Sequence, residues 1–394
     1  MIFNDLRREI GVVFKRPRFS IVVILTLALG IGANTAIFTV VDAVLLRPLA
    51  YRDSDRLVAV YDHDRAGEKW VPAPAEFLDL QAQAKSLEGV AAFRSWDFNL
   101  RHGEGTERAD GAVVTADFFK LLDVSPQLGR PLLPDSTGRV PTDQVVISDR
   151  LWRTRLGGAP GILGQVLVVD GRPMTVVGVM PRRFQFPHPA DLWIASPYRV
   201  PTFPLQPDRD PSTLRNTHYF DVFARVARNS SLAQAEADAG RILTEKVKPE
   251  EGEISGAYLV PIRADMTGDS TPALVILFGA AAVLLLIACA NLANLFLADA
   301  TGRQREWTVR AALGAGRWRL VRERLTESLI LSLLGGSVGL LVAVWGVTLL
   351  QVLAPAEIRD LIDPSPDLRV LGFTAVVSLL TGIGFGVGPA LRAA

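Results

Sequence analysis

The sequence predicts an α+β membrane protein, with four transmembrane helices and a large α/β domain inserted between the first and the second. Two observations carry this prediction. Long uncharged runs stand near both ends of the 394-residue chain, and residues 47–270 between them are polar, with alternating strand and helix signals. The formal net charge is only +1, which argues against the one-signed field of a nucleic-acid-binding protein.

Four uncharged runs predict the membrane segments: residues 19–41, 273–298, 328–354 and 370–391. A helix needs about 20 apolar residues to cross a hydrocarbon core roughly 30 Å thick, and each run is that long. Buried helices of a soluble core are the alternative, which four such runs in one chain disfavour. With their flanking residues, the transmembrane helices are expected at 19–46, 271–298, 328–354 and 370–391.

The first run has a second interpretation, a cleaved signal peptide, because basic residues precede it. Its 23 residues exceed the apolar region of about 7–15 residues that is usual in such peptides. No clear small-residue cleavage site follows it, so we expect a retained anchor.

The distribution of Lys and Arg predicts the orientation, because cytoplasmic loops are enriched in both. Five basic residues precede the first run: Arg7, Arg8, Lys15, Arg16 and Arg18. Residues 299–327 carry seven arginines, whereas residues 355–369 carry two arginines against four acidic residues. Both termini and 299–327 are therefore expected in the cytoplasm, and 47–270 and 355–369 on the other side.

Residues 1–18 place apolar side chains at helical spacing opposite basic ones: Ile2, Phe3, Leu6, Ile10, Val13 and Phe14. This pattern predicts an amphipathic helix on the cytoplasmic membrane surface. An undocked leader is the alternative.

Glycines in the membrane runs predict close helix contacts, because they let two backbones approach in lipid. A G-x-x-x-G motif and a glycine repeat place four of them at expected helix interfaces: Gly335, Gly339, Gly382 and Gly386. Asn291 and Asn294 lie near the cytoplasmic end of the second run. Interhelical hydrogen bonding or a position at the membrane surface is one interpretation of these two residues, and a place on a transport path is the other.

Residues 47–270 have the patterns of a soluble domain. Strands are predicted at RLVAVYDH, VAAFRSWDFNL, HYFDVFARV and GAYLVPIR, and helices at PAEFLDLQAQAKSL and SLAQAEADAGRILTEKV. Two Val-rich runs around Asp170 and Gly171 predict a β-hairpin. We expect two α/β subdomains, one formed by 48–122 with 216–266 and the other an insert at 125–210.

No catalytic, cofactor or metal site is predicted in residues 47–270. The histidines are far apart in sequence and none has metal-ligand spacing. The region has no G-x-S-x-G or H-E-x-x-H motif. The sequence DHD at 62–64 could bind a cation, but a solvated strand end is the simpler interpretation. We therefore expect no enzyme activity.

Five segments, in chain order, carry a family resemblance: GIGANTAIFTVVDAVLLRPL, VVTADFFKLLDVSPQLGRPL, GRPMTVVGVMP, LLLIACANLANLFLA and EWTVRAALGAGRWRLVRERLTESLILSLLGG. They resemble the MacB/FtsX-type permeases of ABC systems, closest to the subfamily that is duplicated in one chain and lacks its own ATPase. The similarity covers essentially the whole chain. It implies a bacterial inner-membrane protein with a large periplasmic domain between helices one and two. No internal repeat is seen, so the chain is expected to be either a half-length relative of this subfamily or part of a longer, duplicated chain.

The resemblance also implies a separate ATPase, since the chain has no G-x-x-x-x-G-K-[ST] motif to hold nucleotide phosphates. In the family, the stretch after the second helix docks on the ATPase, which here is REWTVRAALGAGRWRLV. The expected docking residues are Arg305, Glu306, Val309, Arg310, Leu313, Gly314 and Arg317. A positive-inside loop with interfacial anchors is the alternative.

The expected function is that of a permease subunit in an ABC-type export or mechanotransmission complex. Such a subunit couples ATP hydrolysis by the cytoplasmic ATPase to motion of the periplasmic domain. The alternative is an FtsX-like scaffold that regulates a periplasmic hydrolase or another partner. Besides the membrane and the ATPase, the expected partners are a second copy or a similar half and a periplasmic adaptor protein, without nucleic acid.

Overall fold

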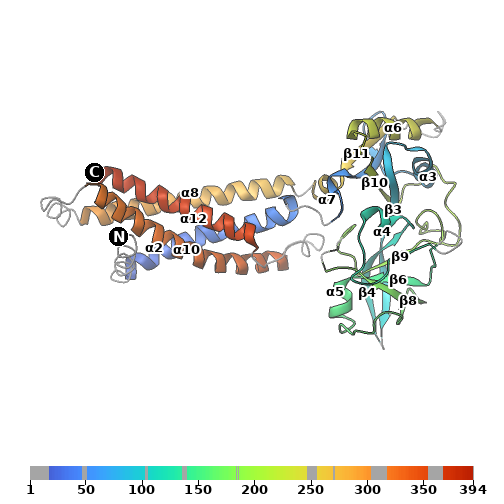
Figure 1. Ribbon diagram of the computed structural model, residues 1–394, viewed down its shortest axis with the longest axis horizontal. Coiled ribbons are helices and arrows are strands. Elements are labelled where there is room, and N and C mark those ends of the chain that lie inside the picture. Colours follow the sequence, from blue (N-terminus) through green and yellow to red (C-terminus); the bar gives the residue numbers. More distant parts are fainter. Residues whose placement is uncertain are drawn as a thin grey trace. The chain divides into compact units, whose positions relative to one another are not determined.

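The computed structural model describes residues 17–46, 51–102, 105–134, 140–182, 184, 186–245, 255–268, 271–302, 317–353 and 367–393. The chain divides into two compact units (Figure 1). The helical unit comes from Met1–Arg47 and Asp269–Ala394, and the sheet unit from Pro48–Gly268. Each unit is described below by itself.

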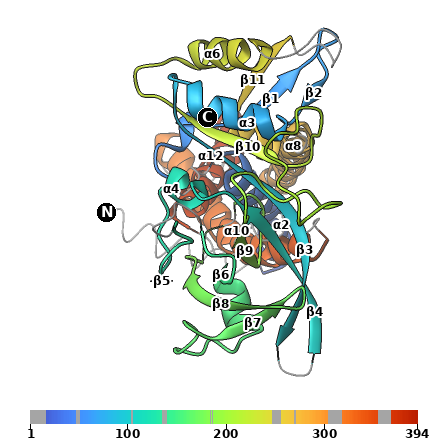
Figure 2. The ribbon, with the colours of Figure 1, turned by 90° about the vertical axis from the view of Figure 1, so that its right-hand side faces the viewer.

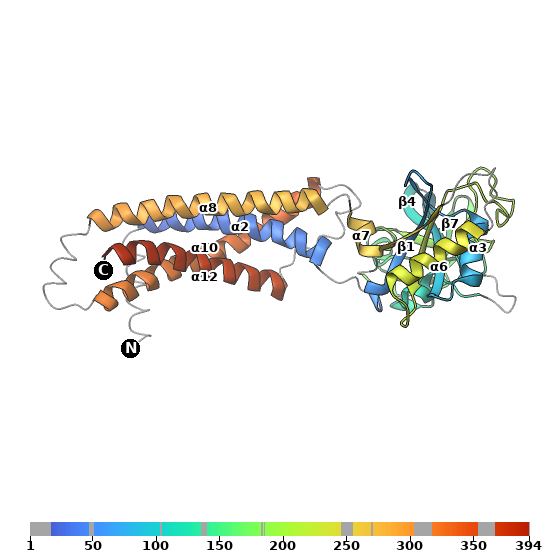
Figure 3. The ribbon, with the colours of Figure 1, turned by 90° about the horizontal axis from the view of Figure 1, so that it is seen from above.

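The helical unit contains four long helices, which lie side by side (Figure 3): α2 Pro17–Val41, α8 Thr271–Gly302, α10 Arg317–Leu353 and α12 Leu368–Ala393. A short π-helical turn, η1 Asp42–Leu46, follows α2. Among the described residues, three helices have apolar stretches long enough to cross a membrane: Pro17–Val41, Thr271–Ala298 and Leu325–Leu349. A shorter apolar stretch, Leu368–Gly384, belongs to α12. In the sequence, one apolar helix precedes the large strand-rich domain and three follow it, which confirms the predicted fold class.

The sheet unit is built on one eleven-stranded mixed sheet (Figure 2). Its strands are β1 Leu57–His63, β2 Lys69–Trp70, β3 Leu87–His102, β4 Gly105–Val114, β5 Leu128–Gly129, β6 Gln144–Ile147, β7 Val166–Val169, β8 Arg172–Val179, β9 Leu192–Ala195, β10 Asp221–Val226 and β11 Gly256–Pro261. The main path runs β11-β1-β10-β3-β4-β9-β6-β8-β5. The β4–β9 and β6–β8 pairs are parallel and the other pairs are antiparallel.

Strand β3 links two groups of strands because it is 16 residues long. Its first part pairs with β10, from Leu87 to Phe93, and its second part pairs with β4, from Phe93 to His102. The sheet continues into residues expected in the other subdomain through β7, which pairs with β3, and through β9, which pairs with β4.

Two helices cover one face of the sheet at the β11-β1-β10-β3 end: α3 Pro74–Gln83 and α6 Leu232–Glu245. The core below them includes Phe77 and Leu80 of α3 against Val58 and Val60 of β1. The other face carries an aromatic core with Phe93, Phe118, Phe186, Phe223 and Trp193. Shorter helices complete the unit: η2 Ser54–Arg56, α4 Phe118–Leu122, α5 Asp149–Thr154 and α7 Ile262–Thr267.

The predicted hairpin is present as β7 and β8. Asp170 and Gly171 both have positive φ, 46° and 77°, as the favoured two-residue hairpin turn requires. The helix expected over 74–87 ends earlier, at Gln83, because Leu87 already begins β3. Strand β9 and helix α7 were not predicted, and β9 joins β4 to β6 within the sheet.

The chain enters and leaves the sheet through neighbouring strands. β1 is its first strand and β11 its last, and they pair antiparallel with Val58 opposite Pro261. The first residues of β1 and the last residues of β11 therefore lie side by side.

Candidate functional site

The candidate site of the helical unit is the packing around α10. This helix runs without a break from Arg317 to Leu353, so it begins before the uncharged run that starts at Ser328. It packs against both α2 and α12 (Figure 3). One rigid element therefore joins the end of the arginine-rich segment to the apolar core of the helical unit.

Arg317, one of the seven predicted docking residues, is the first residue of α10. The other six lie outside the described residues: Arg305, Glu306, Val309, Arg310, Leu313 and Gly314. The same holds for the amphipathic segment up to residue 16 and for most of the loop 355–369.

Helices α2 and α10 meet backbone to backbone at a pair of glycines. A Cβ on Gly32 would lie 2.8 Å from the carbonyl oxygen of Gly339. A Cβ on Gly339 would lie 3.1 Å from the Ala28 oxygen and from the Gly32 nitrogen. One turn earlier in α10, a Cβ on Gly335 would lie 2.6 Å from Cβ of Leu27. The G-x-x-x-G motif thus faces α2.

The residues Gly335 to Gly339 also spell G-G-S-V-G, which matches the G-x-S-x-G pattern of hydrolases. That pattern acts catalytically on a sharp strand-to-helix turn, whereas Ser337 lies within continuous helix and donates its hydroxyl hydrogen to Leu333 O at 2.9 Å. The segment is therefore a packing motif.

Helices α10 and α12 meet through serines and glycines. A Cβ on Gly382 would collide with Oγ of Ser332, and one on Gly336 with Oγ of Ser378. Ser328 donates its hydroxyl hydrogen to the carbonyl of Gly382 at 2.9 Å. Gly386 lies further along α12, beyond the residues whose side chains are described.

Buried polar side chains tie the helices together. Asn34 of α2 donates from Nδ2 to the carbonyl of Ala281 in α8 at 2.8 Å. The hydroxyls of Thr35 and Thr374 lie 3.1 Å apart across α2 and α12. Hydroxyls of other buried residues bond to carbonyls of their own helices. These groups use their hydrogen bonds within the protein, as polar groups in lipid must.

An ion pair and a buried acid add charge to this packing. Asp42 is 2% exposed at its side chain, and its Oδ1 lies 3.3 Å from Nη1 of Arg369 in α12. Glu327, at the start of the apolar part of α10, is buried. Glu327 was not predicted from the sequence as a buried residue, although an acid next to an uncharged run was a usable signal.

The two asparagines of α8, Asn291 and Asn294, are not among the fully buried residues of the helical unit. Large apolar side chains of α8 are exposed as well, including Ile276, Leu284 and Leu286. This surface suits lipid or a second copy of the chain.

In the sheet unit, the expectation of a solvated strand end at 62–64 is wrong for Asp62, which is 1% exposed. Alternation along β1 puts its side chain on the same face as Val58 and Val60. Helices α3 and α6 cover that face. Burial rather than solvation therefore governs the chemistry of this carboxyl group.

Comparisons with known proteins match this two-part organisation. Residues 20–242 match the MacB-like periplasmic core domain, and residues 278–394 match the FtsX-like permease C-terminal domain. Neither matched domain is an ATPase domain.

Individual relatives found by sequence comparison are also MacB proteins. The macrolide export ATP-binding/permease protein MacB of Chromobacterium violaceum is 28% identical over 283 residues, 71% of this chain and 41% of the relative. The protein of the same name from Agrobacterium fabrum is 26% identical over 327 residues, 82% of this chain and 47% of the relative. The chain thus spans less than half the length of these curated relatives.

Among solved structures, the periplasmic region of MacB from Actinobacillus actinomycetemcomitans is similar, with 14% identity and a TM-score of 0.37. That similarity covers 55% of this chain and 94% of the solved chain.

Proposed function

Because the chain belongs to the MacB/FtsX family of ABC transporter permeases, we propose that it is the membrane subunit of an export or mechanotransmission complex. In this proposal a separate cytoplasmic ATPase docks on residues 305–321. Its motion passes along α10 into the helical unit and on to the periplasmic domain. Both termini lie in the cytoplasm.

The observation that carries the proposal is the continuity and close packing of α10. A single helix from Arg317 to Leu353 transmits displacement along its axis, because its backbone hydrogen bonds resist stretching. The glycine contact between Gly32 and Gly339 leaves no space between α10 and α2. A shift of α10 therefore displaces α2, which leads directly to the sheet unit in the sequence.

Transmission of motion is favoured over a hydrophilic path within one chain. The buried polar groups of the helical unit, such as Asn34 and Thr35, are hydrogen-bonded to neighbouring helices. Groups that are already paired offer few sites for a hydrated substrate. The exposed apolar side chains of α8 support a further proposal, pairing with a second copy or a similar half.

Within the periplasmic domain we propose two subdomains with different tasks. Residues 48–122 with 216–266 would connect to the membrane helices, and residues 125–210 would present a surface to a periplasmic adaptor protein. The pairing of β3 with β7 and of β4 with β9 would hold the two subdomains together.

The docking proposal is tested by the double variant Glu306→Lys, Ala312→Asp. Charge placed against a docked surface costs about 2–5 kcal/mol, which is roughly 30-fold or more in affinity. The variant should insert normally, because several arginines remain in the loop, and should lose its co-purifying ATPase.

The matched control makes the same residue changes in the loop 355–369, as Glu357→Lys with Ala356→Asp, and should keep the ATPase. Equal ATPase recovery by wild type and the 306/312 variant would contradict docking. Crosslinking in intact cells separates the alternative: a hydrolase on the periplasmic domain with no ATPase on the cytoplasmic side indicates a scaffold.

A further inference from the structure

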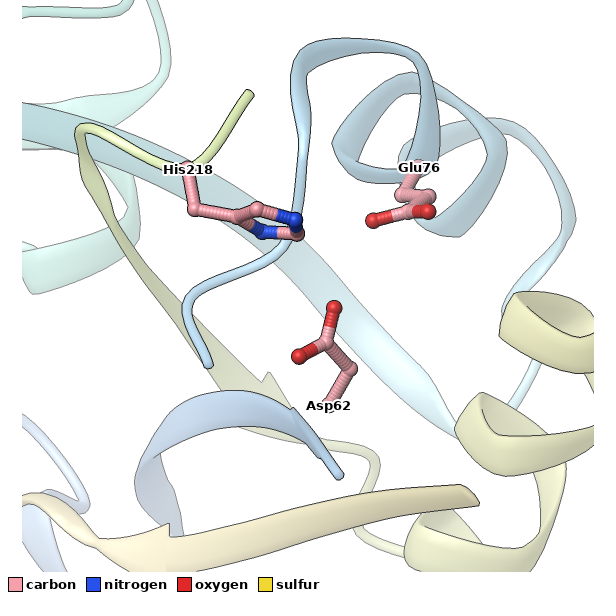
Figure 4. Close-up of side chains that lie close together, drawn as sticks. All are labelled: Asp62, Glu76 and His218. Atoms are coloured by element: carbon pink, nitrogen blue, oxygen red, sulfur yellow. The ribbon is translucent and has the colours of Figure 1, made fainter. Parts of the chain in front are cut away.

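Three side chains from separate elements of the sheet unit converge on one point (Figure 4). Asp62 comes from β1, Glu76 from the first turn of α3, and His218 from the segment that leads into β10. One potential ligand atom of each lies within 4.8 Å of those of the other two. Figure 4 shows the two carboxyl groups and the imidazole directed toward a common centre.

Asp62 lacks the partners that a buried carboxyl group requires. Among the described residues, neither of its carboxylate oxygens has a hydrogen-bond partner, although both are buried. Burial, together with the Glu76 carboxylate, raises the pKa of Asp62 to about 8. Buried carboxylates in proteins are normally paired or bound to metal ions, so this oxygen pair is an open ligand position.

Glu76 is held in place by its own helix. Its Oε2 accepts the backbone N–H of Ala73 at 2.7 Å, which fixes the carboxyl group at the start of α3. The nearby cation Arg215 is already bound to Asp79, with Nη2 2.8 Å from Oδ2. The hydrogen bond from Ala73 therefore orients the Glu76 carboxyl group. The Arg215 guanidinium is paired with Asp79 and not with Asp62.

His218 has the second contact that is typical of a metal ligand. Its Nδ1 lies 2.5 Å from the carbonyl oxygen of Val71. Since a carbonyl only accepts, Nδ1 is the donor, and the lone pair of the neutral ring is on Nε2. Metal-binding histidines almost always donate their other ring N–H in this way. His218 is also exposed, so the cluster borders solvent on the side of the imidazole.

We propose that Asp62, Glu76 and His218 form a binding site for a divalent transition-metal ion, Zn²⁺ in the first instance. Zn²⁺ takes imidazole nitrogen and Asp or Glu oxygen as ligands, and three protein ligands leave the fourth position to water. The imidazole disfavours Mg²⁺ and Ca²⁺, which take oxygen ligands. The ion would tie the segment before β10 to β1 and α3. This site is independent of ATPase docking.

The test uses the full chain without an affinity tag, purified in detergent and stripped of metal with a chelator. Zn²⁺ binding is measured by calorimetry and by metal analysis after dialysis. We expect one Zn²⁺ per chain, and a melting temperature that rises with Zn²⁺ and does not rise with equal Mg²⁺.

Three conservative variants test the ligands: Asp62→Asn, Glu76→Gln and His218→Gln. A glutamine at position 76 can still accept the Ala73 N–H, and one at position 218 can still donate to Val71, so both variants should fold, as circular dichroism will check. Removal of the outer hydrogen-bond partner of a metal ligand lowers metal affinity by roughly 10- to 100-fold. Each of these variants removes a ligand itself, so its Zn²⁺ affinity should fall by more than this. The control His102→Gln, at the exposed end of β3, should bind as wild type does.

Wild-type protein that binds no Zn²⁺, or folded variants that bind it as tightly as the control, would overturn the site. Asp62 would then be a protonated acid beside Glu76. Equal stabilisation by Mg²⁺ would also overturn it, because His218 would not be a ligand.

Discussion

The contact between Gly32 of α2 and Gly339 of α10 predicts a stability loss from a single added methyl group. In Gly32→Ala the new Cβ would lie 2.8 Å from the Gly339 oxygen and 3.1 Å from the side chain of Val342. The first of these neighbours is backbone, so relief requires a shift of α10 itself. Overpacking of this kind costs about 1–3 kcal/mol.

Helix propensity opposes this loss, because Ala is favoured over Gly by about 1 kcal/mol in a helix interior. The matched control Gly279→Ala, within α8, makes the same change where the new Cβ has no atom within 4 Å apart from its own stretch of helix. The propensity gain is common to both variants and cancels in their difference. Gly32→Ala should therefore be less stable than Gly279→Ala by about 1–3 kcal/mol.

The assay is unfolding of each purified full-length variant in detergent, by heat and by titration with a denaturing detergent. The proposed function adds a second readout, since loosening of the α2–α10 contact should reduce the coupling between ATPase activity and the periplasmic domain. Equal stability of the two variants, or a more stable Gly32→Ala, would refute close packing at this contact.

Three further predictions concern orientation and the sheet unit. In a Cys289→Ala background, a cysteine at Ser270 should react with a membrane-impermeant thiol reagent in intact cells and one at Gly316 should not; the reverse pattern would invert the orientation. Arg225→Met should lower the free energy of unfolding of the sheet unit by about 2–4 kcal/mol. The reason is that the Arg225 guanidinium donates to backbone carbonyls, one of them buried at 2.6 Å. An unchanged midpoint in chemical denaturation would contradict this. Gly171→Ala should lower the free energy of unfolding by about 1 kcal/mol. Alanine is strained at the φ of 77°, whereas the space around the residue is open, so only the backbone contributes. A gain in stability would argue against this turn.

The membrane part was predictable because lipid imposes strict rules on sequence. Uncharged runs indicated the four helices, and glycine spacing pointed to residues that the structure places at helix contacts, such as Gly339. The hairpin at Asp170 and Gly171 was equally clear, since few residue pairs adopt its turn.

Other features depend on neighbours distant in sequence. Strand β9 has only four residues, and it exists through pairing with β4 and β6. Asp62 and His218 are 156 positions apart in the chain, and the pairing of β1 with β10 brings them together. The sequence around Asp62 has the pattern of an ordinary strand end, and the sequence around His218 that of a loop. The burial of Glu327 likewise depends on which helices surround it.

The pairing of β1 with β11 has a consequence for how such proteins diversify. Because Val58 lies opposite Pro261, the start of β1 and the end of β11 are separated by about the spacing of neighbouring strands, roughly 5 Å. A domain with adjacent ends can be inserted into a host chain without forcing the host's flanking segments apart. Exchange of the sheet unit for another domain with neighbouring termini should therefore leave the four helices able to assemble.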